Sequence, residues 1–299
     1  MEQSKKLFII GNGFDLHHGL PTRYTDFIDF VERRYPREYA WLHRSVKEYA
    51  LGYWDIIDKA DKGYVWNNME DLLGSFEPME LLAEHMVWDT DKGYKGPPSE
   101  EIQQLLHFGL HISEYLNAWL AALWPKIEAL RSLKNLEELF AGEKPVLSFN
   151  YTQTLERVYG IKDVLHIHGA SGQPLIMGHG NGDCGKMYGE DFGINKVNYK
   201  YIRRYYIQTN KDTGKIIKRN QDFFSRRNLS KVVEVCVLGH SLNAIDMPYI
   251  ERLQKLMSSE VRWTVAYLSE TDREIYSKIL DELGIREGQI RFIPWDSLK

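Results

Sequence analysis

The sequence has few cysteines and no long apolar run. Only Cys184 and Cys236 are present among its 299 residues. Two cysteines fit a reducing compartment and are too few for a zinc site built from four cysteines. Nowhere do 18 apolar residues follow one another, and the N-terminus lacks the apolar core of a signal peptide. We therefore expect a soluble, cytoplasmic protein with no membrane partner.

The chain also carries little net charge. Its formal charge of −4 at pH 7 gives no overall attraction to nucleic acid or to an anionic membrane. No Asp or Glu stands near a histidine at a spacing that proposes a metal site, so we expect none. A hydrophobic content of 43% is enough for a large core, either in one α/β domain or in one domain with a substantial insertion.

Residues 5–21 have the pattern of a strand, a glycine turn and then a helix. The apolar run 7–10 stops at Gly11, Asn12 and Gly13, and a helical pattern begins near Thr25. Because glycine has no Cβ, such a turn after a buried parallel strand lets backbone N–H groups approach a phosphate. Asn12 and Asp15 would add donors and acceptors for a ribose or a base. The alternative is a tight turn without a ligand.

Further β-branched runs alternate with helical patterns towards the C-terminus. The expected strands cover residues 145–149, 164–167, 232–238, 261–268 and 289–293. Thr271 with Glu274 forms a capping-box pattern, and Gly284 would end the helix that follows. Runs of this kind predict a Rossmann-like open parallel sheet in an α/β domain, formed by residues 1–34 and 143–299.

Residues 35–142 differ in character. Strand-like runs disappear there, and leucine and aromatic positions recur at helical spacing. A break at residues 92–99, which contains two glycines and two prolines, separates two helical groups. We predict that this segment is a large α-helical insertion.

Polar residues follow four of the expected strands directly. They are Gly11, Asn150, His168 and Gly239. Because the carboxyl ends of parallel strands meet at one edge of a sheet, the pattern predicts a ligand site in the crevice there. For His168, the alternative is a buried histidine that is bonded to the backbone and has no chemical role.

Four separated motifs resemble those of the sirtuins. Residues 11–21, GNGFDLHHGLP, match the glycines and the proline of the sirtuin opening, and Asn150 precedes a helical stripe as in the sirtuin Thr-Gln-Asn-Ile-Asp segment. Residues 166–169, HIHG, are similar to the motif of the catalytic histidine, and residues 239–242, GHSL, resemble the turn that touches the NAD phosphates.

A more specific resemblance is to the bacteriophage abortive-infection AbiH family, whose members carry a sirtuin-like nucleotide fold. It rests on residues 8–27, on WNNME at 66–70, on SFNYT at 148–152 and on GHSLNAID at 239–246. The resemblance implies an anti-phage defence protein that binds NAD or a related nucleotide. It is also compatible with a phage-derived trigger and with a homo-oligomer.

The two resemblances imply a reaction and a set of site residues. The reaction is hydrolysis of the nicotinamide–ribose bond, with Asn150 positioning water and ribose and His168 acting as the base. The zinc-dependent deacetylation of sirtuins is not expected, because the four zinc cysteines are missing. The nucleotide-binding residues would be Gly11, Asn12, Gly13, Asp15, Gly239, Ser241 and Asp246.

Two other functions compete with this hypothesis. Residues 196–231 hold eleven Lys or Arg against two Asp, and tyrosines and phenylalanines are interleaved with the charges. Such a surface suits nucleic acid, whereas the alternative structure is a solvated hairpin around Asp212, Thr213 and Gly214. The protein could also be an interaction module with a non-catalytic nucleotide pocket.

Overall fold

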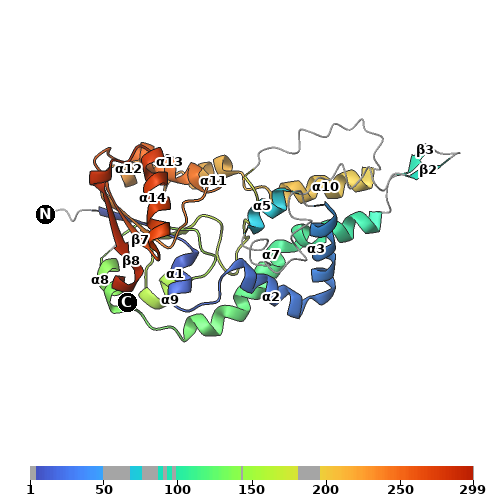
Figure 1. Ribbon diagram of the computed structural model, residues 1–299, viewed down its shortest axis with the longest axis horizontal. Coiled ribbons are helices and arrows are strands. Elements are labelled where there is room, and N and C mark those ends of the chain that lie inside the picture. The colour runs from blue at the N-terminus through green and yellow to red at the C-terminus, as the bar shows by residue number, and fades with distance from the viewer. Residues whose placement is uncertain are drawn as a thin grey trace. The chain divides into compact units, whose positions relative to one another are not determined.

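The computed structural model describes residues 5–49, 68–75, 87–89, 93–95, 99–142, 144–180 and 196–298 (Figure 1). The chain forms two compact units. The sheet unit comprises Met1–Thr22, Leu120–Leu175 and Thr213–Lys299, and the helical unit comprises Arg23–Trp119 and Ile176–Asp212.

The sheet unit is built on six parallel strands in the order β5-β4-β1-β6-β7-β8. Counted along the chain within this sheet, that order is 3-2-1-4-5-6, which is the order of the doubly wound dinucleotide-binding fold. The predicted open parallel α/β sheet is therefore confirmed, and its strand order fits the Rossmann type. The strands are β1 Lys5–Ile10, β4 Val146–Ser148, β5 Val164–His166, β6 Val232–Leu238, β7 Arg262–Tyr267 and β8 Ile290–Pro294.

The central strands are apolar because helices cover both faces of the sheet. Four consecutive residues of β1, from Leu7 to Ile10, are fully buried. Phe8 lies beside Val146 of β4 on one side and Cys236 of β6 on the other. Phe8 also belongs to a core cluster with residues of α1, α8, α9 and the C-terminal η3.

The helices of the sheet unit are short apart from α13 and α14. They are α1 Asn12–His17, α8 Lys134–Phe140, α9 Thr154–Tyr159, α11 Thr213–Arg219, α12 Arg226–Leu229, α13 Met247–Leu256 and α14 Glu270–Glu282, with the 3-10 helices η2 Glu287–Gln289 and η3 Trp295–Leu298.

Two local predictions at helix ends are corrected. The first helix after β1 is α1, which starts directly at Asn12, so Gly11 alone precedes it; the pattern near Thr25 belongs to the next helix. The capping box of α14 is formed by Ser269 and Asp272, not by Thr271 and Glu274. The Ser269 hydroxyl accepts from the Asp272 N–H at 3.1 Å, which places the helix start two residues earlier.

The helical unit packs mainly through aromatic and aliphatic side chains. Phe27 and Trp119 approach to 5.3 Å between ring centroids, and Phe108 stacks on Tyr115 at 5.6 Å. Its helices are α2 Tyr24–Arg34, α3 Pro36–Tyr49, α5 Met69–Gly74 and α10 Lys196–Thr209, together with most of α7 Ser99–Glu128, which continues into the sheet unit.

The prediction that residues 35–142 contain no strands is wrong. Strands β2 Val87–Asp89 and β3 Gly93–Lys95 pair antiparallel, and β3 falls within the predicted break. The domain boundaries 1–34, 35–142 and 143–299 stay a prediction, since the two compact units divide the chain at other positions. No helix of the described residues has the length and apolarity needed to cross a membrane.

The close approach of α1 to the turn after β6 yields a prediction at Gly239. Its φ of 72° is left-handed, and a Cβ there would lie 2.2 Å from the Phe14 nitrogen. Gly160 has a similar φ of 66° but open space around it. In chemical unfolding, Gly160→Ala should cost about 1–2 kcal/mol and Gly239→Ala about 1–3 kcal/mol more. Equal losses would show that the turns are not tightly packed.

Candidate functional site

The edge formed by the carboxyl ends of the strands has its switch point between β1 and β6. There the Gly11 N–H donates to the Leu238 carbonyl at 3.1 Å, and the Gly13 N–H donates to the Gly239 carbonyl at 2.8 Å. A Cβ on Gly11 would lie 2.5 Å from the Cα of His240. The glycines thus let two turns touch, and their N–H groups are engaged within the protein.

Asp15 of α1 is the centre of a buried polar cluster in the sheet unit. Its side chain is 1% exposed and accepts from the Thr152 hydroxyl at 2.5 Å and the Thr154 hydroxyl at 2.7 Å. The neighbouring Asn150 side chain also favours the carboxylate, with the smallest effect on its pKa. Burial raises the pKa of Asp15 to about 6, against the opposing effect of these bonds and of the His166 charge.

His166, the last residue of β5, is held by two acceptors. Its Nδ1 lies 2.8 Å from the main-chain oxygen of Asn150, and its Nε2 lies 2.7 Å from Glu156 Oε1. Because neither oxygen can donate, both ring nitrogens must carry protons. Burial lowers the pKa of His166, but the bonds to Glu156 and Asn150 and the charges of Glu156 and Asp15 raise it above its ordinary value. His166 is therefore an imidazolium.

Asn150 lies two residues beyond β4, between these groups. It is 7% exposed, and its Oδ1 has no hydrogen-bond partner in the described part of the chain. Since the Asp15 carboxylate accepts, the Nδ2 of Asn150 faces it, and Oδ1 is left for another donor. A buried acceptor without a partner costs about 1–3 kcal/mol, which a ligand donor would recover.

A second cluster links the ends of β5 and β6. Asp246, which precedes α13, has Oδ1 3.7 Å from His168 Nε2 and Oδ2 3.4 Å from His240 Nε2. The Leu242 N–H donates to His240 Nδ1 at 2.9 Å, so a neutral His240 carries its proton on the nitrogen facing Asp246. All three side chains of the His168–Asp246–His240 set are at least nine-tenths buried.

Phe149 joins the two clusters. It directly precedes Asn150, and its ring centroid lies 5.5 Å from that of His168 and 4.1 Å from that of His240. Among the residues predicted for the site, Asn12 and Ser241 are exposed. The Asn12 amide donates to the Thr22 carbonyl at 2.8 Å, so it contributes to holding the chain after α1.

The structure thus gathers the predicted site residues at one edge, although in separate groups. Asn150 and Asp15 belong to the first cluster, His168 and Asp246 to the second, and the predicted glycines pack the turns. Sequence reasoning missed four polar partners, Thr152, Thr154, His166 and His240. The available signal was the histidine pair 166/168 and the threonine pair 152/154, whose members are two residues apart and lie at or beside the predicted site residues.

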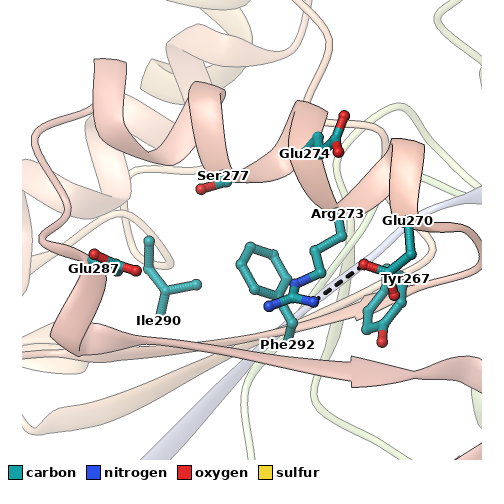
Figure 2. A pocket seen from close by; sticks show the side chains of 8 residues that line it. All are labelled: Tyr267, Glu270, Arg273, Glu274, Ser277, Glu287, Ile290 and Phe292. Carbon is teal, nitrogen blue, oxygen red and sulfur yellow. Dashed lines mark hydrogen bonds and ion pairs between the residues drawn. The ribbon is translucent and has the colours of Figure 1, made fainter.

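A groove of about 610 Å³ lies elsewhere on the sheet unit, between α14 and β8. Figure 2 shows Arg273 above the Phe292 ring, at 5.6 Å, and paired with Glu270 at 3.1 Å. None of the residues predicted for the site lines it. In the described residues, no group of three or more His, Cys, Asp or Glu is arranged to hold a metal ion.

The basic segment 196–231 is largely helical, and its helices α10, α11 and α12 are joined by short non-helical stretches. Helix α11 starts at Thr213, so the predicted hairpin around Asp212 is wrong. Lys211 is buried and pairs with Glu70 at 2.6 Å within the helical unit, which removes it from any binding surface. Exposed basic residues remain on α10 and α11, in different units: Lys200, Arg203, Arg204, Lys215, Lys218 and Arg219.

The buried Asp15 predicts a pH dependence of stability. With a folded pKa of about 6 against 3.8 for the free group, its contribution is complete below pH 4 and is lost as the pH rises through 6. The loss is about 3 kcal/mol. The free energy of unfolding of Asp15→Asn relative to wild type should therefore rise by about 3 kcal/mol between pH 4 and pH 7.

The exposed Asp163 provides the control for this measurement, because its side chain lies on the surface of the same unit. Urea titrations of Asp163→Asn should show no comparable change with pH. If the free energies of unfolding of Asp15→Asn and wild type differ by the same amount at every pH in this range, the raised pKa of the buried Asp15 is contradicted.

Comparison with known proteins agrees with the motifs that surround these clusters. The family model described as bacteriophage abortive infection AbiH matches residues 7–267. No curated protein matches the chain. The matched range runs from β1 to the end of β7 and includes both polar clusters. Since it covers well over half of the sequence, the chain belongs to the bacteriophage abortive-infection AbiH family.

Proposed function

We propose that this AbiH-family protein, whose family implies a role in phage abortive infection, binds NAD or a related nucleotide and hydrolyses its nicotinamide–ribose bond. The observation that carries the proposal is the free Oδ1 of Asn150. It is a buried acceptor on a segment that Asp15 binds through Thr152 and Thr154, at the carboxyl edge of a sheet with the 3-2-1-4-5-6 strand order.

The strand order supports nucleotide binding over other small ligands. In open parallel sheets, ligands bind outside the carboxyl ends at the point where the strand order reverses. Here that point lies between β1 and β6, and the turns after both strands meet there through Gly11, Gly13 and Gly239. The sirtuin-like character of the pocket remains part of this proposal.

The reaction itself requires little from the protein beyond positioning and proton transfer. The C–N bond breaks with its electron pair going to the nicotinamide nitrogen, which neutralises the ring and leaves an oxocarbenium-like ribose. Water then adds to the anomeric carbon and loses a proton to a base. Asn150 suits the positioning role, because Oδ1 can accept from a water or a ribose hydroxyl.

His168 is the candidate base. Asp246 lies 3.7 Å from its Nε2 and would stabilise the imidazolium that forms when His168 takes the proton. This role of Asp246 competes with the nucleotide contact that the sequence suggests, because its two carboxyl oxygens face His168 and His240.

The phosphates would bind through groups other than those the glycine motif suggests. The N–H groups of Gly11 and Gly13 already donate to main-chain oxygens. The Ser241 side chain is exposed beside the same turns. We therefore propose Ser241 as a phosphate contact and assign the glycines to the packing that brings it there.

Nucleic-acid binding is the second candidate, supported by one face of α10. Lys200, Arg203 and Arg204 are exposed, and the two arginines stand three and four residues after Lys200, as on a single helical face. Binding of labelled single-stranded DNA that weakens steeply as salt rises would support this function. Nucleotide turnover that is insensitive to salt would support the enzyme.

We predict that the purified protein, alone or with a phage-infected extract as the trigger, converts NAD to ADP-ribose and nicotinamide. His168→Ala should lower kcat by about 10²- to 10⁴-fold, because it removes the base. Asn150→Ala should abolish turnover, because water and ribose lose their positioning. Chromatography of timed NAD incubations measures both effects.

His111→Gln serves as the control, since His111 lies on α7 in the helical unit and pairs with Glu114. Its turnover should equal that of wild type. Unchanged turnover in both site variants would refute the assignment. If wild type shows no turnover, a thermal-shift screen decides whether nucleotides bind: ligand at 100 times its Kd stabilises the fold by about 2.7 kcal/mol.

A further inference from the structure

We propose that Asp15 and His166 are positioning residues that hold Asn150 from two sides, so that its Oδ1 faces the nucleotide. This inference rests on the proposed function and deepens it. Asp15 then has a role different from the ribose contact that the sequence suggests, and His166, Thr152 and Thr154 acquire roles that sequence reasoning did not assign.

The side chain of Asn150 lies with its amide nitrogen towards Asp15. Asn150 lowers the pKa of Asp15, and since a carboxylate can only accept, the group that favours it is the Nδ2. The opposite orientation would set two acceptors against each other. Oδ1 therefore points away from Asp15, and this matches its lack of a partner in the described part of the chain.

The main chain of Asn150 is held as well. The Nδ1–H of His166 donates to the Asn150 carbonyl at 2.8 Å, and the other ring nitrogen donates to Glu156 at 2.7 Å. His166 thus links β5, the end of β4 and α9. Because both hydrogen bonds need an N–H on the ring, His166 can make them together only when the ring is protonated and positively charged.

Asp15 has no remaining direction for a ligand. Thr152 donates to one of its oxygens and Thr154 to the other, and the residue is 1% exposed. Both hydroxyls belong to the segment that also carries Asn150. The carboxylate therefore orders this segment, and the ligand meets the amide that it orders.

The charged groups around Asp15 define how the arrangement responds to pH. His166 on β5 is the charge that acts on it, and Glu156 on α9 in turn faces His166. A protonated Asp15 must donate from one oxygen, so it can no longer accept from Thr152, Thr154 and Asn150 together. The hold on the amide then weakens.

A matched pair of variants at Thr154 tests this arrangement in the NAD reaction. Thr154→Val removes one donor to Asp15 with almost no change of shape, whereas Thr154→Ser keeps the hydroxyl. We expect the acidic limb of kcat, near pH 6 in wild type, to move about 1 pH unit upwards in Thr154→Val. In Thr154→Ser it should stay in place. Equal profiles for the two variants would overturn the proposal.

A measurement without nucleotide separates this inference from the proposed function. In ¹H–¹⁵N spectra, the Asn150 side-chain amide should exchange with water about tenfold or more faster in Asp15→Ala than in wild type, because the segment that carries it loses the hydrogen bonds of Thr152 and Thr154 to a charged group. Asp163→Ala, at an exposed position of the same unit, should leave it unchanged. The same exchange rate in Asp15→Ala and wild type would refute the hold on Asn150.

The imidazole spectrum of His166 provides a second measurement, and its signals would not change if the residue had a merely structural role. Both ring nitrogens should be protonated at pH 7 in wild type, and Glu156→Gln should make the ring neutral. A neutral His166 in wild type would overturn the proposal. If wild type neither hydrolyses nor binds any nucleotide, the proposed function is refuted. The amide exchange and the imidazole spectrum still test the roles of Asp15 and His166.

Discussion

The buried carboxylate of Asp15 is the interaction on which the arrangement of this edge depends. An isolated carboxylate would be costly at that depth, and its pKa of about 6 reflects the cost. Two threonine hydroxyls and the imidazolium of His166 compensate for it. The compensation ties α1 to the segment after β4 and to the end of β5, so three elements that are distant in sequence are fixed together.

The sheet explains why these elements meet. Their strands are parallel neighbours, so their carboxyl ends lie side by side, and the chain reverses its strand order between β1 and β6. The contact of the two turns at this point requires residues without a Cβ, and Gly13 and Gly239 meet that requirement. Because the main-chain N–H groups of the turns already bond to main-chain oxygens, ligand contacts fall to side chains, chiefly Asn150 and His168.

Much of this fold is predictable from the sequence, because periodicity reports local burial. The run 232–238 is apolar except for Glu234 and forms β6 with the same bounds. Local signals fail where several are close together: two capping patterns overlap at the start of α14, and the Asp212–Gly214 turn signal lies at the start of a helix. Short α1 was missed because glycine and asparagine are poor helix formers.

The candidate site is predictable in its location and less so in its roles. Residues at strand ends must share an edge, so Asn150 and His168 could be named. The pairs that surround them are distant in sequence, 10 residues for His166 with Glu156 and 137 for Asp15 with Thr152, and no local pattern encodes such pairs. The hydrogen bond of the Gly13 N–H likewise depends on Gly239, which follows a different strand.

The most direct measurement of the central claim is an NMR titration of the isotope-labelled protein with ADP-ribose, which cannot lose nicotinamide. The account predicts the largest shifts at the Asn150 side-chain amide and at the main-chain amide of Ser241, with small shifts at the α14–β8 groove. Shifts concentrated at Arg273 and Phe292, with Asn150 unmoved, would contradict it.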